Sequence, residues 1–242
     1  CGYIGSHTCY VLLEAGYNLI VIDSNINSSD IPLSRLTNLK YSKQINFDNS
    51  LKFFRGDICD PSLLRSIFME AENQGKSIDG VIHFAGLKSV SESIASPLPY
   101  WEKNVGGTIS LLKVMNEFNC KTIVFSSSAS IYSFSGMNLL KEDNLIKPIS
   151  PYAQTKDAIE KILLSTFESS KDWKISNLRY FNPIGAHPTG TIGENFSTKL
   201  DNLFPHICMV ATGIKKYLQI FGNDWPTQDG TDRKSTRLNS SH

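Results

Sequence analysis

Five short apolar runs alternate with helical patterns along most of this chain, and that alternation is the strongest constraint on its fold. The runs are rich in β-branched and aromatic residues and lie at 18–23, 51–57, 80–86, 122–128 and 174–182. Helical patterns lie before Gly16 and at about 61–75, 104–118 and 152–168. Strands that are apolar at nearly every position and joined by helices form a parallel sheet covered on both faces. We therefore expect a doubly wound α/β fold.

The composition divides the chain into three parts. The alternation fills residues 1–182, and after it Pro, Gly and Asn increase, so we expect 183–231 to begin a smaller region that covers a substrate. The polar connection at 24–50 is expected to carry a short helix. Residues 232–242 are polar and without pattern, and we expect them to derive from a sequencing-library adapter and not from the protein.

The first residues have the spacing of a phosphate-binding glycine loop that leads into a helix. Gly2 and Gly5 match the second and third glycines of G-x-x-G-x-x-G, which let a pyrophosphate approach a helix N-terminus. Asp23 ends the next strand, where a carboxylate accepts hydrogen bonds from the ribose of NAD. Asp57 closes the following strand, where a carboxylate can meet the adenine edge, and capping of a turn is an almost equal alternative for it. The spacing predicts a dinucleotide site, with ordinary turns and caps as the alternatives, and a strand and a first glycine are expected before Cys1.

A second pattern supplies proton-transfer chemistry. The segment "SPYAQTK" places Tyr152 and Lys156 four residues apart at the start of a helix, so both side chains lie on one face. A nearby ammonium stabilises a phenolate, and we therefore expect a lowered pKa for Tyr152 and a base that works near neutral pH. The serines at 126–128 end the preceding strand and supply a hydroxyl. Alone, such a pair is more often a surface pair, but with a dinucleotide site it predicts proton abstraction during hydride transfer.

Seven segments together resemble the UDP-sugar 4-epimerases of the extended short-chain dehydrogenase/reductase family: "GYIGSHT", "HFAGLKSVSES", "NVGGT", "FSSSASIY", "SPYAQTK", "LRYFNPIGAHPTG" and "IFGNDWPTQDGT". The resemblance implies a Rossmann-like fold in which residues 1–182 bind NAD tightly. It implies interconversion of UDP-glucose and UDP-galactose, in galactose metabolism, through a 4-keto sugar that rotates in a roomy pocket. By the family's mechanism Tyr152 takes the proton of the sugar O4, Ser128 assists, and Lys156 binds the nicotinamide ribose and tunes Tyr152.

The resemblance also assigns ligand contacts position by position. Cofactor contacts fall on Gly2, Tyr3, Ile4, Gly5, Asp23, Asn25, Asn27, Ser28, Asp57, Ile58, Phe84, Ala85, Gly86, Lys88, Asn104 and Phe181. Substrate contacts fall on Ser128, Asn182, Asn202, Leu203, Gln219, Ile220 and Phe221. Core packing is an equal alternative for Phe181 and Phe221, because aromatic residues at strand ends usually pack. The residues after Tyr132 depart from the family pattern, which has a glycine there, so this loop is expected to differ in shape.

Charge and cysteine usage exclude several other classes of function. The net charge is +1, which gives no sign of a nucleic acid or an anionic membrane as partner. The five cysteines are scattered without metal-ligand spacing, which favours a reducing compartment and predicts no metal site. No apolar run is long enough to span a bilayer. We expect a cytoplasmic enzyme whose partner is a UDP-sugar, and the resemblance implies a homodimer.

Two other functions remain open at this point. A nucleotide-sugar dehydratase on the same scaffold would carry Asp-Glu directly after the strand-end hydroxyl residue, whereas this chain has Ala129 and Ser130. A non-catalytic NAD-binding protein of this type would tend to lose the Tyr152 and Lys156 pair, which is present. We also expect the chain as written, without the first strand of its fold, to be insoluble or inactive when expressed.

Overall fold

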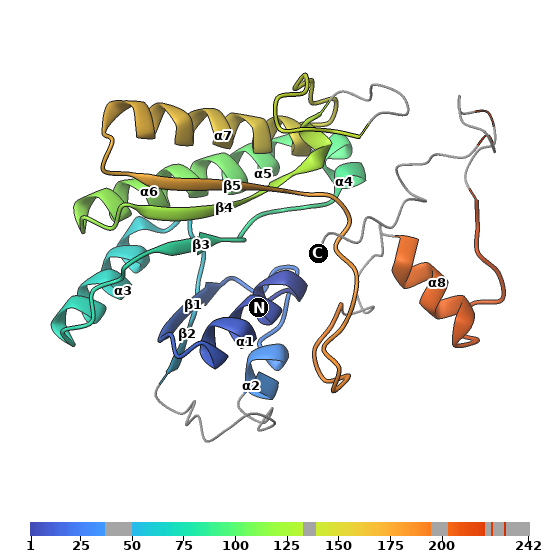
Figure 1. Ribbon diagram of the computed structural model, residues 1–242, viewed down its shortest axis with the longest axis horizontal. Helices are drawn as coiled ribbons and strands as arrows, with labels where there is room; N and C mark the ends of the chain where they lie inside the picture. Colours follow the sequence, from blue (N-terminus) through green and yellow to red (C-terminus); the bar gives the residue numbers. More distant parts are fainter. Residues whose placement is uncertain (37–49, 133–138, 195–202, 221–223, 225–229, 231–242) are drawn as a thin grey trace. The chain divides into compact units, whose positions relative to one another are not determined.

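The computed structural model describes residues 1–36, 50–132, 139–194, 203–220, 224 and 230 (Figure 1). The chain divides into two compact units. The first unit comprises residues 1–16, 29–45 and 182–242, and the second, here called the sheet unit, comprises 17–28 and 46–181. The five strands of the described residues all belong to the sheet unit.

The strands of the sheet unit are all parallel, as the apolar runs predict. They are β1 (Leu19–Asp23), β2 (Leu51–Arg55), β3 (Val81–His83), β4 (Thr122–Ser128) and β5 (Lys174–Tyr180). They form a two-stranded sheet, β1-β2, and a three-stranded sheet with the order β3-β4-β5. Among the described strands, no hydrogen-bonded pair joins one sheet to the other.

The helices of the sheet unit follow the predicted pattern with some additions. They are α3 (Pro61–Asn73), α4 (Val90–Ala95), α5 (Pro97–Tyr100), the π-helix η2 (Trp101–Gly106), α6 (Gly107–Glu117), the 3-10 helix η3 (Ala129–Ile131) and α7 (Pro151–Ser169). The short helices α4, α5, η2 and η3 were not predicted from the sequence. Figure 1 shows α7 running alongside β4 and β5.

The core of the sheet unit joins β4 to its helices. Ile123 and Phe125 of β4 are fully buried in one cluster with residues of three helices and one loop: Leu64, Phe68, Leu111, Leu112, Val114, Met115, Ile159, Leu163 and Trp173. Fully burying one such side chain contributes about 1.5–3 kcal/mol. The cluster therefore fixes β4 and α7, the two elements that carry the predicted catalytic residues.

The first unit contains α1 (Tyr3–Glu14), α2 (Ile31–Leu36) and α8 (Leu203–Ala211). α1 ends as predicted, because Gly16 follows it with a φ of +87°, a left-handed conformation that favours glycine after a helix. α2 confirms a short helix in the connection at 24–50. None of the helices that the structure describes is both long and apolar enough to cross a membrane.

Candidate functional site

The end of β4 and the first turns of α7 bring together the three predicted catalytic residues. α7 begins at Pro151 because Ser150 caps it: the Ser150 Oγ accepts a hydrogen bond from the Ala153 N–H at 3.2 Å. Tyr152 therefore lies in the first turn, with Lys156 one turn further along the same face. Ser128 is the last residue of β4. Its Oγ accepts hydrogen bonds from the Ser130 N–H at 3.2 Å and from the Ser130 Oγ at 2.9 Å, and its hydroxyl lies close enough to the Tyr152 hydroxyl to lower the pKa of that phenol.

The pKa of Tyr152 differs from the sequence prediction. Burial raises the pKa of Tyr152 above its ordinary value, and the hydrogen bond with Ser128 offsets only part of that effect. The sequence predicts a lowered pKa because Lys156 is close, and this prediction is wrong. The Lys156 Nζ lies 5.8 Å from the centroid of the Tyr152 ring and donates its hydrogen bond elsewhere. Ser128, and not Lys156, is therefore the side chain that lowers the pKa of this phenol.

Lys156 is a buried cation. Only 5% of the residue is exposed, and its Nζ donates a hydrogen bond to the Ser126 carbonyl oxygen at 2.7 Å. The Nζ also lies 4.8 Å from the centroid of the Phe125 ring, a cation–π distance. Burial lowers the pKa of Lys156 to about 8, because desolvation disfavours the charged form. A lysine with this pKa can change protonation state close to physiological pH.

His83 at the end of β3 was missed in the sequence analysis. It is 3% exposed, and burial together with the charge of Lys156 lowers its pKa to about 3, so the imidazole is neutral. Its Nε2 lies 2.9 Å from the Thr108 Oγ1, whose proton goes to the Asn104 carbonyl oxygen at 2.6 Å. The Nε2 therefore donates, which identifies the tautomer. The only sequence signal was a polar residue inside an apolar strand.

Asn104, a predicted cofactor contact, holds the loop that follows β3. Its Oδ1 accepts from the Leu87 N–H at 2.8 Å, and its Nδ2 donates to the Leu87 carbonyl at 3.0 Å and to the Thr155 Oγ1 at 3.2 Å. Both amide protons are thus used within the protein. Gly86 has a φ of +156°, and a Cβ added there would lie 2.9 Å from the Asn104 Oδ1. The loop therefore depends on glycine at position 86.

Two predicted carboxylates lie at the ends of neighbouring strands: Asp23 is the last residue of β1, and Asp57 lies in the turn after β2. The Asp23 Oδ1 accepts from the Asn25 N–H and from the Ser28 Oγ, each at 2.8 Å, and Asn25 has a φ of +57°. The Asp57 Oδ1 accepts from the Cys59 N–H at 2.9 Å, and its Oδ2 forms an ion pair with the Lys103 Nζ at 2.8 Å. Turn capping and ligand binding are therefore compatible roles for both carboxylates.

The glycine loop lies in the first unit. Gly2 is the N-cap of α1 and has no side chain that could accept hydrogen bonds from the first turn. The backbone N–H groups of that turn can therefore bind an anion. Tyr3, Ile4 and Gly5 form that first turn. The Tyr3 hydroxyl donates to the Gly185 carbonyl at 2.7 Å within the same unit. This arrangement fits the predicted phosphate site at a helix N-terminus.

The remaining predicted ligand contacts differ in their exposure and in the elements that carry them. Phe181 is 45% exposed, which argues against the core-packing alternative, whereas Ile58 is 7% exposed. Phe84, Ala85 and Lys88 lie in the loop after β3, and Asn27 lies in the turn after β1. In the first unit, Leu203 begins α8, and Asn182, Gln219 and Ile220 lie outside helices and strands. Asn202 and Phe221 lie outside the described residues.

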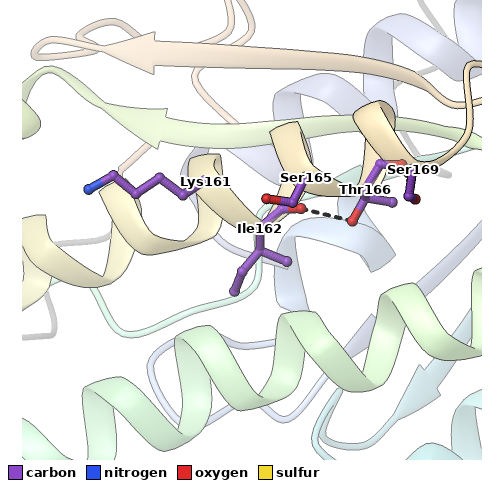
Figure 2. Close-up of a pocket in the computed structure, with 5 residues that line it drawn as sticks. All are labelled: Lys161, Ile162, Ser165, Thr166 and Ser169. Carbon is purple, nitrogen blue, oxygen red and sulfur yellow. Dashed lines mark hydrogen bonds between the residues drawn. The ribbon is translucent and has the colours of Figure 1, made fainter.

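A pocket of about 420 Å³ lies on α7 away from these residues. It is lined by Lys161, Ile162, Ser165, Thr166 and Ser169, and the Thr166 Oγ1 donates to the Ile162 carbonyl at 2.8 Å (Figure 2). None of the predicted site residues lines it, so it is not the predicted substrate site. Over the described ranges, no cluster of His, Cys, Asp and Glu side chains is arranged to hold a metal ion.

Comparison with known proteins gives one family and a consistent set of relatives. The family model described as GDP-mannose 4,6 dehydratase matches residues 1–234. UDP-glucose 4-epimerase of Bacillus subtilis (strain 168) is 44% identical over 230 residues, which are 95% of this chain and 64% of that protein. UDP-glucose 4-epimerase 2 of Arabidopsis thaliana is also 44% identical over 230 residues, covering 95% and 63%. The chain thus spans less than two thirds of the length of these relatives.

Solved structures agree with this comparison. UDP-glucose 4-epimerase from Bifidobacterium longum, in complex with NAD⁺ and UDP, matches with a TM-score of 0.84 and 38% identity. The enzyme from Stenotrophomonas maltophila, with bound NAD and formylated UDP-arabinopyranose, matches with a TM-score of 0.84 and 36% identity. Each match covers 95% of this chain and 65% of the other. These similarities confirm the predicted Rossmann-like α/β fold.

Proposed function

The chain belongs to the family described as GDP-mannose 4,6 dehydratase, and from this premise we propose that it carries the catalytic part of an NAD-dependent UDP-glucose 4-epimerase. The observation that carries the proposal is the arrangement of β4 and α7. The Ser128 hydroxyl lies close enough to the Tyr152 hydroxyl to lower its pKa, and the buried Lys156 lies one helical turn further on. The similarity to UDP-glucose 4-epimerases supports UDP-glucose and UDP-galactose as the substrates.

The proposed reaction needs one proton acceptor next to the sugar C4, the carbon whose configuration changes. Tyr152 takes the proton of the sugar O4. Ser128 hydrogen-bonds with the sugar O4 and with the Tyr152 hydroxyl oxygen while the proton moves. Lys156 binds the nicotinamide ribose and keeps positive charge near the phenolate as it forms. The 4-keto sugar then rotates, and the other epimer forms when Tyr152 returns the proton to O4 and the hydride returns to the opposite face of C4. Asn182, Asn202, Leu203, Gln219, Ile220 and Phe221 remain the proposed substrate contacts.

The residues present fit a dinucleotide cofactor. The uncapped N-terminus of α1 in the first unit suits a pyrophosphate, and Asp23 and Asp57 in the sheet unit suit the hydroxyl and amino groups of an adenosine. When bound, NAD supplies the hydride acceptor and donor at the sugar C4. We propose that the predicted cofactor residues make these contacts, each in its own unit.

Replacing Gly86 with Ala is expected to weaken cofactor retention. The added Cβ meets Asn104 and the φ of +156° is strained for alanine, at a cost of about 1–3 kcal/mol, so the loop after β3 must shift. The measurement is the molar ratio of NAD to purified protein. Gly75→Ala is the control, because Gly75 also has a positive φ, +67°, but has open space around it. An unchanged NAD ratio in Gly86→Ala would contradict the proposal.

The proposed function is tested by expressing the complete reading frame that contains this chain. Conversion of UDP-galactose to UDP-glucose, measured in a coupled assay, is the expected result. NAD binding without turnover would favour the non-catalytic alternative. Release of a 4-keto-6-deoxy sugar would favour a dehydratase, which Ala129 and Ser130 oppose, because neither supplies the general acid for a leaving hydroxyl.

We also propose that the complete enzyme is a homodimer and acts in the cytoplasm, in galactose metabolism. An exposed apolar group on α4, α5 and η2 supports the dimer: Ile94, Leu98 and Trp101 are 65%, 77% and 39% exposed. Light scattering of the complete protein tests the dimer. No disulfide joins the five cysteines, all of which the structure describes, and this supports the cytoplasm. Cells that lack the enzyme are expected to accumulate UDP-galactose on galactose medium.

A further inference from the structure

An ion pair between a partly buried arginine of β5 and a buried glutamate of α7 lies next to the end of β4. Arg179 of β5 and Glu160 of α7 have side chains that are only 18% and 8% exposed. The Arg179 Nε donates to both oxygens of the Glu160 carboxylate, at 3.0 and 3.3 Å, and the Nη2 donates to Oε2 at 2.7 Å. It also accepts a hydrogen bond from the Ser127 Oγ. One carboxylate therefore joins β4, β5 and α7.

The other side of the same guanidinium holds the segment that follows Ser128. The Arg179 Nη1 donates to the Tyr132 hydroxyl at 2.7 Å and to the Glu142 carbonyl oxygen at 2.8 Å. The guanidinium carbon lies 5.0 Å from the centroid of the Tyr132 ring. Tyr132 directly follows η3 and forms a β-bridge with Ile146. A planar fork of N–H donors makes these contacts together, which an ammonium cannot do.

Glu160 of the ion pair lies on the same face of α7 as the proposed reacting residues Tyr152 and Lys156. The three serines that end β4 each contact α7 at a different turn: Ser128 contacts Tyr152, the Ser126 carbonyl contacts Lys156, and Ser127 contacts Glu160. Tyr152, Lys156 and Glu160 are spaced four residues apart and share one face of α7. A shift of β4 along α7 would therefore change the Ser128–Tyr152 contact and the Lys156 contact together.

From these contacts we propose that Arg179 and Glu160 are positioning residues for proton transfer at Tyr152. They hold the end of β4 and the Ala129–Tyr132 segment against α7, and so keep the Ser128 hydroxyl at the Tyr152 hydroxyl. This inference rests on the proposed function of Tyr152 and assigns a role to two residues that do not themselves react. Small displacements of such groups have large effects on rate, up to about 100-fold for about 1 Å.

The test compares Arg179→Lys with a matched control in the complete protein. The control is Arg65→Lys, because Arg65 forms a similar bidentate pair with Glu117, at 2.7 and 2.8 Å, between α3 and α6. We expect Arg179→Lys to lower kcat about 10- to 100-fold while KM changes less than about threefold and NAD stays bound. Arg65→Lys is expected to leave kcat unchanged.

A double variant separates positioning from folding. Arg179→Leu combined with Glu160→Leu removes both buried charges at once, and such apolar replacement commonly keeps or raises stability. We expect its melting temperature to stay near that of the unsubstituted protein while kcat stays low. Recovery of kcat together with stability would overturn the proposal, as would an unchanged kcat in Arg179→Lys.

A turnover-independent measurement keeps this inference apart from the proposed function. If the unsubstituted protein converts no UDP-sugar, the proposed function fails on its own. The position of Tyr152 is then read from its ring-carbon signal in protein labelled with [ζ-¹³C]tyrosine, identified by its loss in Tyr152→Phe. Arg179→Lys is expected to shift that signal and Arg65→Lys is not; a signal that does not move in Arg179→Lys overturns the inference.

Discussion

Replacing Tyr152 with Phe is expected to lower kcat for UDP-galactose conversion by about 10²–10⁴-fold, the usual contribution of a positioned general base. The substitution removes one hydroxyl from a partly buried side chain and leaves Lys156 and its bond to Ser126 in place. NAD is therefore expected to stay bound and the fold to stay intact. Kinetics at saturating UDP-galactose, together with the NAD content of the purified protein, are the measurements.

The matched control is Tyr17→Phe, which removes the same hydroxyl from a residue that is 60% exposed. Its kcat is expected to equal that of the unsubstituted protein. Ser128→Ala offers a second comparison: it keeps the Tyr152 hydroxyl but removes the Ser128 hydroxyl beside it, together with the cap that this hydroxyl gives to η3, and is expected to have a smaller effect on kcat than Tyr152→Phe. Turnover within a factor of about three in Tyr152→Phe would contradict the role that we assign to this residue.

Elements with strong local signals could be predicted from the sequence nearly to the residue. β4 occupies Thr122–Ser128 as predicted, and α7 spans Pro151–Ser169 against a predicted 152–168, because Ser150 and Pro151 define its start locally. The helix expected at 104–118 differs: α6 begins at Gly107, and the π-helix η2 precedes it. Buried hydrogen bonds of Asn104 to Leu87 and Thr155 fix that wider turn, and no local pattern encodes them.

The candidate site also has a part that local sequence predicts and a part that only the fold determines. Residue types and spacing place Tyr152 and Lys156 on one helix face, but they do not give the burial that raises the pKa of Tyr152. The Asp57–Lys103 pair joins residues 46 positions apart, and its contribution depends on the fold that brings β2 and η2 together. Charge pairs that span separate elements are thus the part that sequence reasoning misses, although they set the electrostatics of the site.

Replacing Lys156 with Met is expected to lower kcat by about 100-fold or more and to change the pH dependence of stability. Burial lowers the pKa of Lys156 from 10.5 to about 8. Below pH 8 both the folded and the unfolded chain are protonated, so the folded state carries the full cost of burying the charge. Above pH 10.5 neither is protonated and the cost disappears. Relative to Lys156→Met, the unsubstituted protein should therefore gain about 3 kcal/mol in unfolding free energy between pH 7 and pH 11.

Urea unfolding of both proteins at several pH values measures this gain. Carrying out the comparison in the Tyr152→Phe background removes the titration of the neighbouring phenol. Lys161→Met is the control on the same helix: the Lys161 side chain is 72% exposed, and its pair with Asp157 should contribute at most about 1 kcal/mol. A difference between Lys156→Met and the unsubstituted protein that stays flat with pH would mean that Lys156 is not buried as a charge. Its nearness to Tyr152 would then be a matter of packing and not of electrostatics.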